Sequence, residues 1–179
     1  MHIQNNKVYR IALTGMLSCL AMIFSYIEML FPINFIGIPG IKIGFANIVI
    51  LFALYLMDVK YAVLIELIRV VITGLLFGNL YSIIYSLCGG MFSLLIMILI
   101  KKIKKFSICG VSAMGGIFHN IGQLVVAVFT VSEIRLSYYM PFLMLSGLLF
   151  GLLNGVVITY VFYHIESGGE HDRIFEGNN

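Results

Sequence analysis

Long apolar stretches separated by short polar breaks dominate the chain from residue 11 to residue 165. Crossing the ~30 Å hydrocarbon core of a membrane takes about 20 apolar residues, because a helix rises about 1.5 Å per residue. Dividing the chain at its charges, prolines and turn residues gives six such segments: Ile11–Phe31, Ile41–Met57, Tyr61–Phe77, Leu80–Ile100, Ile108–Val131 and Tyr139–Tyr163. The pattern therefore predicts an all-α integral membrane bundle of six transmembrane helices.

The breaks between these segments predict how the helices connect. The second and third segments are separated only by residues 58–60, so we expect an antiparallel helical hairpin there. Gly78 and Asn79 make an equally tight turn before the fourth segment. The longest external loop is Pro32–Gly40, whose prolines and glycines would break a helix but suit an ordered cap over a bundle.

Composition supports the membrane assignment. The chain has 179 residues, of which 61% are hydrophobic and 11% charged, and its mean hydropathy is +1.05. A soluble domain carries roughly 25% charged residues. Because the apolar segments follow one another without a polar half, we predict one domain over residues 1–165. Residues 166–179 are polar and acidic and predict a disordered cytoplasmic tail.

The basic residues predict the orientation, because Lys and Arg are retained on the cytoplasmic side of a membrane. With both termini in the cytoplasm of a multi-pass cell-membrane protein, the outer loops hold Lys42 and Arg135. The cytoplasmic side then holds eight basic residues: Lys7, Arg10, Lys60, Lys101, Lys102, Lys104, Lys105 and Arg173. The run from Lys101 to Lys105 is interpreted as an anchor on anionic headgroups of the lipid bilayer; we expect no nucleic acid as a partner.

Glycines at four-residue spacing predict close helix contacts, because membrane helices associate through small residues. The last segment has Gly147, Gly151 and Gly155 on one stripe. Internal packing is the expected role, and a flat face that docks another membrane subunit is the alternative.

Polar side chains within the apolar segments are the candidate binding residues. An ionisable group at membrane depth costs about 2.5 to 3.5 kcal/mol, so it usually faces a partner or a wet cavity. Counting along the helices predicts one outward-opening cavity, which Glu28 could join, lined by Lys42, Asn47, Arg69, His119, Asn120 and Gln123. Arg69 and Lys42 would suit a carboxylate or a phosphate.

Structural roles for some of these residues stay open. Arg69 could instead pair with Glu66 and hold the bundle together, and His119 could make a structural hydrogen bond. For Asn154, on the glycine stripe, we expect an interhelical hydrogen bond.

Motifs for catalysis, metals or cofactors are not found in the sequence. The three cysteines lack metal-ligand spacing, and no GxxxxGK[ST] phosphate loop is present. The two aspartates, Asp58 and Asp172, are far apart, whereas prenyl diphosphate synthases hold Mg²⁺ with clustered carboxylates. We therefore expect no enzymatic activity, catalytic residue, metal or cofactor in this chain.

Several stretches resemble a known family. They are Pro39–Met57, Arg69–Gly78, Ser86–Ser93 with its double glycine, and His119–Gln123. They look like the "Gx transporter" family, which older annotation calls heptaprenyl diphosphate synthase component I. That family is similar in size and six-helix layout to the substrate-binding S-components of energy-coupling factor (ECF) vitamin transporters.

This resemblance implies a membrane subunit that captures a small micronutrient solute on the outside. Its first helix would dock a transmembrane coupling protein through a small-residue face at Ala12, Gly15 and Cys19, and cytoplasmic ATPases would supply the energy. Met16, four residues after Ala12, departs from the Ala-xxx-Ala face typical of S-components. The alternatives are a non-catalytic accessory component of a prenyl diphosphate synthase, or of a quinone- or flavin-linked membrane assembly.

Overall fold

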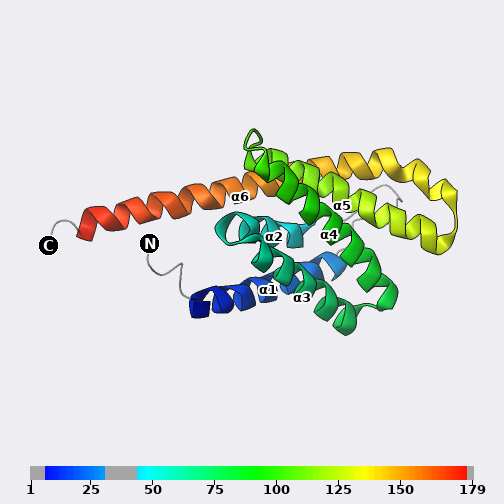
Figure 1. The fold of residues 1–179 in the computed structure, drawn as a ribbon, viewed down its shortest axis with the longest axis horizontal. Coiled ribbons are helices and arrows are strands. Elements are labelled where there is room, and N and C mark those ends of the chain that lie inside the picture. Colours follow the sequence, from blue (N-terminus) through cyan, green and yellow to red (C-terminus); the bar gives the residue numbers. More distant parts are fainter. Residues whose placement is uncertain (1–6, 31–43, 177–179) are drawn as a thin grey trace.

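The computed structural model describes residues 7–30 and 44–176, with side chains as far as Ile165. These residues form α-helices joined by short turns, and no strand occurs among them (Figure 1). The elements are α1 (Lys7–Leu30), α2 (Phe45–Leu56), α3 (Val59–Phe77), α4 (Leu80–Lys102), α5 (Ile108–Val131), the short 3-10 helix η2 (Ile134–Tyr139) and α6 (Met140–Glu176).

The helices follow the predicted segments closely, with a difference at the end of α6. The turn of Asp58 between α2 and α3 and the turn of Gly78 and Asn79 between α3 and α4 lie where the sequence predicts them. However, α6 continues to Glu176, through the segment for which the sequence predicts a disordered tail. Propagating an existing helix adds one hydrogen bond per residue fixed, without a new nucleation cost, and Gly168 and Gly169 do not end it.

Among the described residues, four helical stretches are long and apolar enough by themselves to cross a membrane, and together with the shorter helices they are consistent with a membrane bundle. They are Lys7–Leu30, Leu80–Lys102, Ile108–Val131 and Ile134–Ile165. Helix α2 has 12 residues and so spans only about 18 Å. Helix α3 has 19 residues but carries charged side chains at Lys60, Glu66 and Arg69. The chain is a multi-pass membrane protein in which α2 and α3 depend on their neighbours for burial.

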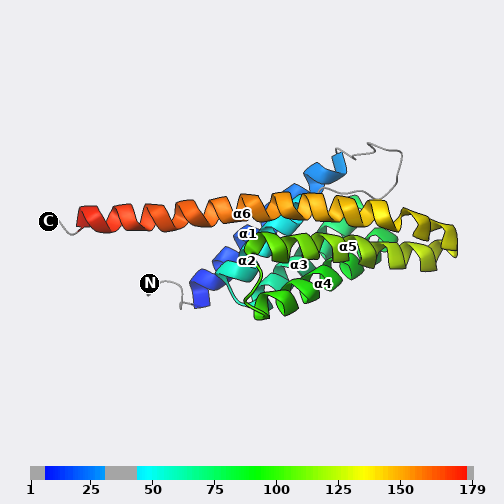
Figure 2. The ribbon, with the colours of Figure 1, turned by 90° about the horizontal axis from the view of Figure 1, so that it is seen from above.

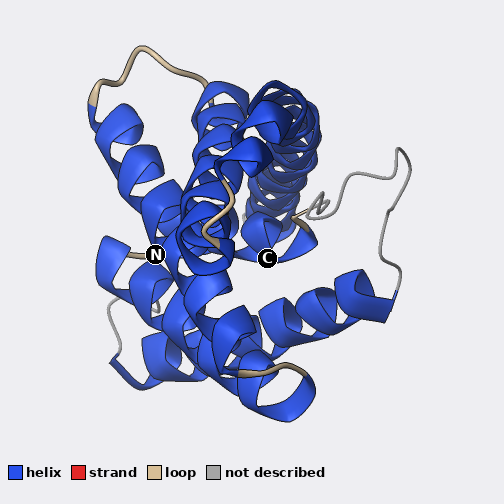
Figure 3. Cartoon of the chain, turned by 90° about the vertical axis from the view of Figure 1, so that its right-hand side faces the viewer, coloured by secondary structure: helices blue, strands red, loops and turns tan. Residues whose placement is uncertain are grey.

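The helices pack in two groups, α1 with α2 and α3 and α4 with α5 and α6, which meet where α3 packs on α4 and α2 packs on α6. Helix α5 lies along both α4 and α6, and the α5–α6 pair runs side by side in two perpendicular views (Figures 1 and 2). Helix α1 packs against α2 and α3. The view from one end shows the helices grouped around the centre of the molecule (Figure 3). The C-terminal part of α6 projects beyond the other helices.

The glycine stripe of α6 packs directly on α5. A Cβ atom added to Gly147 would lie 2.5 Å from the carbonyl oxygen of Gly116, and one added to Gly151 would lie 2.7 Å from that of Ser112. A Cβ atom on Gly155 would lie 2.5 Å from the Cα atom of Cys109. Real Cβ atoms do not approach backbone this closely. The predicted internal role of these glycines is therefore confirmed.

Helix α2 is mostly buried although it is the shortest α-helix of the described chain. Its side chains Val49, Ile50 and Leu54 join one apolar cluster with Leu94 of α4 and Ile158 of α6. Close packing of these side chains against neighbouring helices explains why so short a helix is held in place.

Charged residues tie together the end of the bundle where α2 ends. Arg10 of α1 donates a hydrogen bond to the carboxylate of Asp58. Lys101 donates a 2.6 Å hydrogen bond to the carbonyl oxygen of Leu54, and its ammonium lies 4.5 Å from the centre of the Tyr55 ring. Because the last carbonyls of a helix have no partner within the helix, Lys101 acts as a cap of α2.

Candidate functional site

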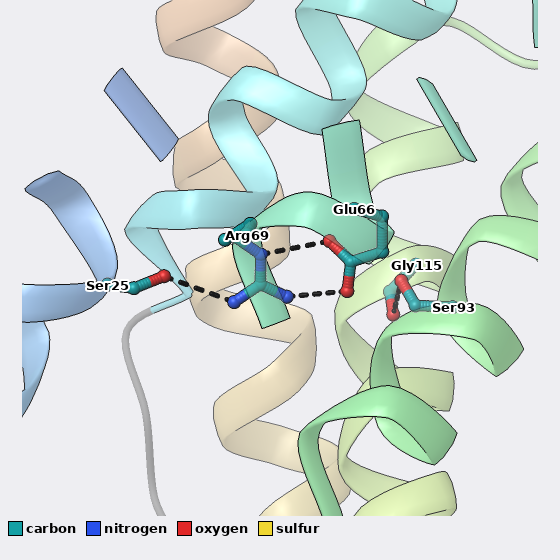
Figure 4. A network of polar contacts seen from close by, with 5 residues as sticks. All are labelled: Ser25, Glu66, Arg69, Ser93 and Gly115. Atoms are coloured by element: carbon teal, nitrogen blue, oxygen red, sulfur yellow. Dashed lines mark hydrogen bonds and ion pairs between the residues drawn. The ribbon is translucent and has the colours of Figure 1, made fainter. Parts of the chain in front are cut away.

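A buried ion pair lies at the centre of the candidate site. Arg69 of α3 donates hydrogen bonds to both carboxylate oxygens of Glu66, one turn earlier, at 3.0 Å from Nε and 2.5 Å from Nη2. Its remaining terminal nitrogen donates to Ser25 Oγ of α1 at 3.1 Å (Figure 4). Glu66 is 1% exposed. The structure thus shows the ion pair that the sequence left open as an alternative.

Gly90 of α4 makes room for this pair. A Cβ atom added there would lie 1.7 Å from Oε1 of Glu66, so no side chain fits beside the carboxylate. One turn further along α4, Ser93 Oγ donates to the carbonyl oxygen of Gly115 at 2.8 Å, linking α4 to α5 (Figure 4). The second glycine of the pair, Gly90, therefore leaves the space that the Glu66 carboxylate occupies.

Gln123 of α5 lies against the first glycine of the pair. A Cβ atom added to Gly89 would lie 2.6 Å from Cγ of Gln123 and 3.0 Å from the backbone oxygen of His119. Gln123 is 1% exposed, and neither its amide oxygen nor its amide nitrogen has a hydrogen-bond partner among the described residues. His119, one turn earlier, is also buried.

Asn120 points to a different helix. Its amide nitrogen donates to the carbonyl oxygen of Leu143 at 2.7 Å and to Ser146 Oγ at 3.3 Å, both on α6. Asn120 therefore joins α5 to α6, whereas Gln123, three residues later, faces α4.

A second group of polar atoms surrounds the start of α2. Gly44 precedes the helix with φ of 75°, a conformation that glycine adopts readily. Its backbone N–H donates to the carboxylate of Glu28 on α1, and its carbonyl oxygen accepts a 3.1 Å hydrogen bond from the amide of Asn154 on α6. The interhelical hydrogen bond predicted for Asn154 is confirmed. Asn47, in the first turn of α2, is partly buried beside Gly44.

Helix α1 connects the two groups, because Ser25 and Glu28 are one turn apart on it. We call the set the polar belt, defined as Ser25, Glu28, Asn47, Glu66, Arg69, His119, Gln123 and Asn154. Of the six residues predicted to bind solute, the belt contains Asn47, Arg69, His119 and Gln123. Lys42 and the predicted cap Pro32–Gly40 lie outside the described residues.

Ser25, Gly44 and Thr73 were not predicted from the sequence. Thr73 follows Arg69 by one turn of α3, and its hydroxyl is buried with no partner in the described part of the chain. Neither serine nor threonine is distinctive in an apolar helix. A glycine before a helix is only a weak signal, because glycine is enriched mainly after helices, and the contacts of Gly44 with Glu28 and Asn154 depend on the tertiary fold.

The face of α1 that points away from the bundle is exposed and is covered by no other helix of the described chain. Ala12, Gly15 and Cys19 are exposed, and a Cβ atom added to Gly15 would meet no atom within 4 Å. The opposite face, with Thr14, Ser18 and Ala21, is buried against the bundle. Within residues 7–30 and 44–165, no three His, Cys, Asp or Glu side chains come together as metal ligands would.

Comparison with known proteins identifies the family. No curated protein and no solved structure matches the chain. A family model described as heptaprenyl diphosphate synthase component I matches residues 17–161, which is well over half of the chain. The chain is therefore a member of the heptaprenyl diphosphate synthase component I family, also labelled the Gx transporter family.

Proposed function

We propose that this protein is the solute-binding subunit of a membrane transporter, similar to an ECF S-component, that takes up a small micronutrient. The observation that carries the proposal is Gln123, a buried amide with no partner for either polar atom in the described residues. Leaving a buried donor or acceptor unpaired costs about 1 to 3 kcal/mol. Because two such atoms sit in an apolar bundle, we infer that a bound solute supplies their hydrogen bonds.

The other belt residues support this proposal. His119 lies one turn from Gln123 on α5. Arg69, on α3, lies on the other side of the double glycine of α4. Asn47 adds a polar side chain from α2, and Thr73, outside the belt but one turn after Arg69 on α3, adds a buried hydroxyl. Asn120 takes a different role in this proposal, because its amide is used between α5 and α6. Lys42, predicted from the sequence, remains part of the proposed site as an outer residue.

The charges at the two ends support an orientation with both termini in the cytoplasm. The end that holds Arg10, Lys60 and Lys101 is rich in basic residues, as the positive-inside rule requires of a cytoplasmic face. In this proposal the polar belt faces the outside of the cell membrane. We propose that partner ATPases supply the energy and that the exposed face at Ala12, Gly15 and Cys19 is the docking surface for a transmembrane coupling protein.

Retention of solute during purification tests the proposal. We expect a small molecule, identified by mass spectrometry after denaturation, to copurify with the wild-type protein in nanodiscs. Gln123→Leu should abolish its retention. Asn120→Leu is the matched control on the same helix, because it removes an amide that binds α6. It should weaken thermal stability and keep the molecule. Equal retention in both variants would remove Gln123 from the site, and absence of any bound molecule would contradict solute capture.

The family description favours a second function, as an accessory component of a heptaprenyl diphosphate synthase. In that role the bundle would present a lipid substrate to a soluble prenyltransferase. Affinity purification from native membranes separates the two functions. A transport subunit should bring down ATPases and a coupling protein, whereas an accessory component should bring down an Asp-rich prenyltransferase.

A further inference from the structure

We propose that Gln123 recognises an uncharged group of the solute that offers one hydrogen-bond donor and one acceptor side by side, such as an amide or a lactam edge. This inference rests on the proposed solute-binding function and names the class of ligand. It differs from the expectation drawn from the sequence, in which Arg69 and Lys42 suited a carboxylate or a phosphate.

The chemistry of the glutamine side chain gives the first argument. A carboxamide carries an acceptor oxygen and a donor nitrogen, and both are without partners in the described residues. An amide or lactam edge pairs with both at once. A carboxylate has only acceptors, so it would bond the amide nitrogen and leave the amide oxygen of Gln123 facing a negative charge.

The charge of the polar belt gives the second argument. The guanidinium of Arg69 is engaged with both carboxylate oxygens of Glu66. An anionic solute that took Arg69 would leave Glu66, which is 1% exposed, as an uncompensated buried charge. The second carboxylate of the polar belt, Glu28, accepts from Gly44 at the start of α2, where the helix dipole favours a negative group. The described belt therefore offers no uncompensated positive side chain on α3 for an anion.

The packing of Gln123 gives the third argument. Its Cγ atom fills the place that a Cβ atom on Gly89 would need. A Cβ atom added to the adjacent Gly122 would lie 3.0 Å from the Cα atom of Gly89. These contacts fix the path of the side chain between α4 and α5. A fixed amide discriminates between ligands better than a mobile one, because little ordering remains to be done on binding.

Matched ligand pairs test the inference. Nicotinamide with nicotinate, and benzamide with benzoate, differ in replacing an amide by a carboxylate; benzylamine adds a cationic member. We would measure binding of each probe to the full chain in nanodiscs by calorimetry and by the shift of its thermal unfolding. We expect wild type to favour each amide over its carboxylate by about tenfold or more, as a site with paired polar groups does. Gln123→Leu should abolish that preference, whereas Asn120→Leu should keep it.

Each outcome bears on one of the two proposals. Preference for a carboxylate or for the amine, or an amide preference that survives in Gln123→Leu, would overturn this inference and leave solute binding intact. If no probe binds, the molecule that copurifies decides, because an anionic molecule overturns the inference and an uncharged one with an amide or lactam edge supports it. The absence of both probe binding and a copurified molecule would overturn the proposed function, and this inference with it.

Discussion

The ion pair of Glu66 and Arg69 makes a quantitative prediction about stability. Arg69→Met removes the guanidinium and leaves a carboxylate that is 1% exposed beside Gly90. Removing one partner of a buried ion pair typically costs about 3 to 5 kcal/mol, because the remaining charge has no compensation. We therefore expect Arg69→Met and Glu66→Leu each to lower the free energy of unfolding by about that amount.

The double variant, with Glu66→Leu and Arg69→Met together, should behave differently. Replacing both charges by apolar groups of similar volume is often neutral or stabilising, so the double variant should unfold close to wild type. The thermodynamic cycle would then show a coupling energy of at least about 6 kcal/mol, because the losses of the two single variants add while the double variant loses little. The ion pair of Arg10 and Asp58 is the control, because its side chains are 27% and 57% exposed and such pairs contribute about 1 kcal/mol or less.

Reversible unfolding in mixed micelles, followed by circular dichroism during titration with sodium dodecyl sulfate, measures these differences. If the effects of the two single variants were additive, or if each cost less than about 1 kcal/mol, Glu66 and Arg69 would not form a buried ion pair in which each charge compensates the other.

Two further substitutions test other contacts. Gly90→Ala should destabilise the bundle about as much as loss of the ion pair, because its Cβ atom would lie 1.7 Å from Glu66 Oε1; Gly15→Ala, where nothing lies within 4 Å, should be neutral or stabilising by up to about 1 kcal/mol. Thermal unfolding compares the two, and equal shifts would contradict the proposed packing. Lys101→Met should cost about 1 kcal/mol by removing the bond to Leu54, while the exposed Lys102→Met should have no measurable effect.

Helix positions were predictable because apolar length and turn residues are local signals. The fifth segment, Ile108–Val131, matches α5 at both ends. The apolar pattern by itself does not show whether α3 spans the membrane, since α3 meets the length requirement but carries three charges, two of which, Glu66 and Arg69, pair with each other within the helix. The end of α6 was also not predicted, because a polar sequence in the continuation of a helix does not itself terminate it.

The sequence predicts which residues belong to the candidate site better than it predicts which of them contact one another. Successive residues of a helix point about 100° apart, so His119 and Gln123 share a face while Asn120 faces α6. The pairing of Arg69 with Glu66 was visible as a three-residue spacing, but the sequence did not decide between this pairing and a ligand.

The contacts of α2 have a consequence for biosynthesis. Its first residues are held by Glu28, already synthesised, and by Asn154, which follows Gly44 by 110 residues; its last turn is held by Lys101, 47 residues after Leu54. A helix of 12 residues is marginal by itself. During translation the contacts that hold α2 are therefore incomplete until Asn154 has been made, and a nascent chain truncated before Asn154 should expose this segment to membrane proteases that the finished protein resists.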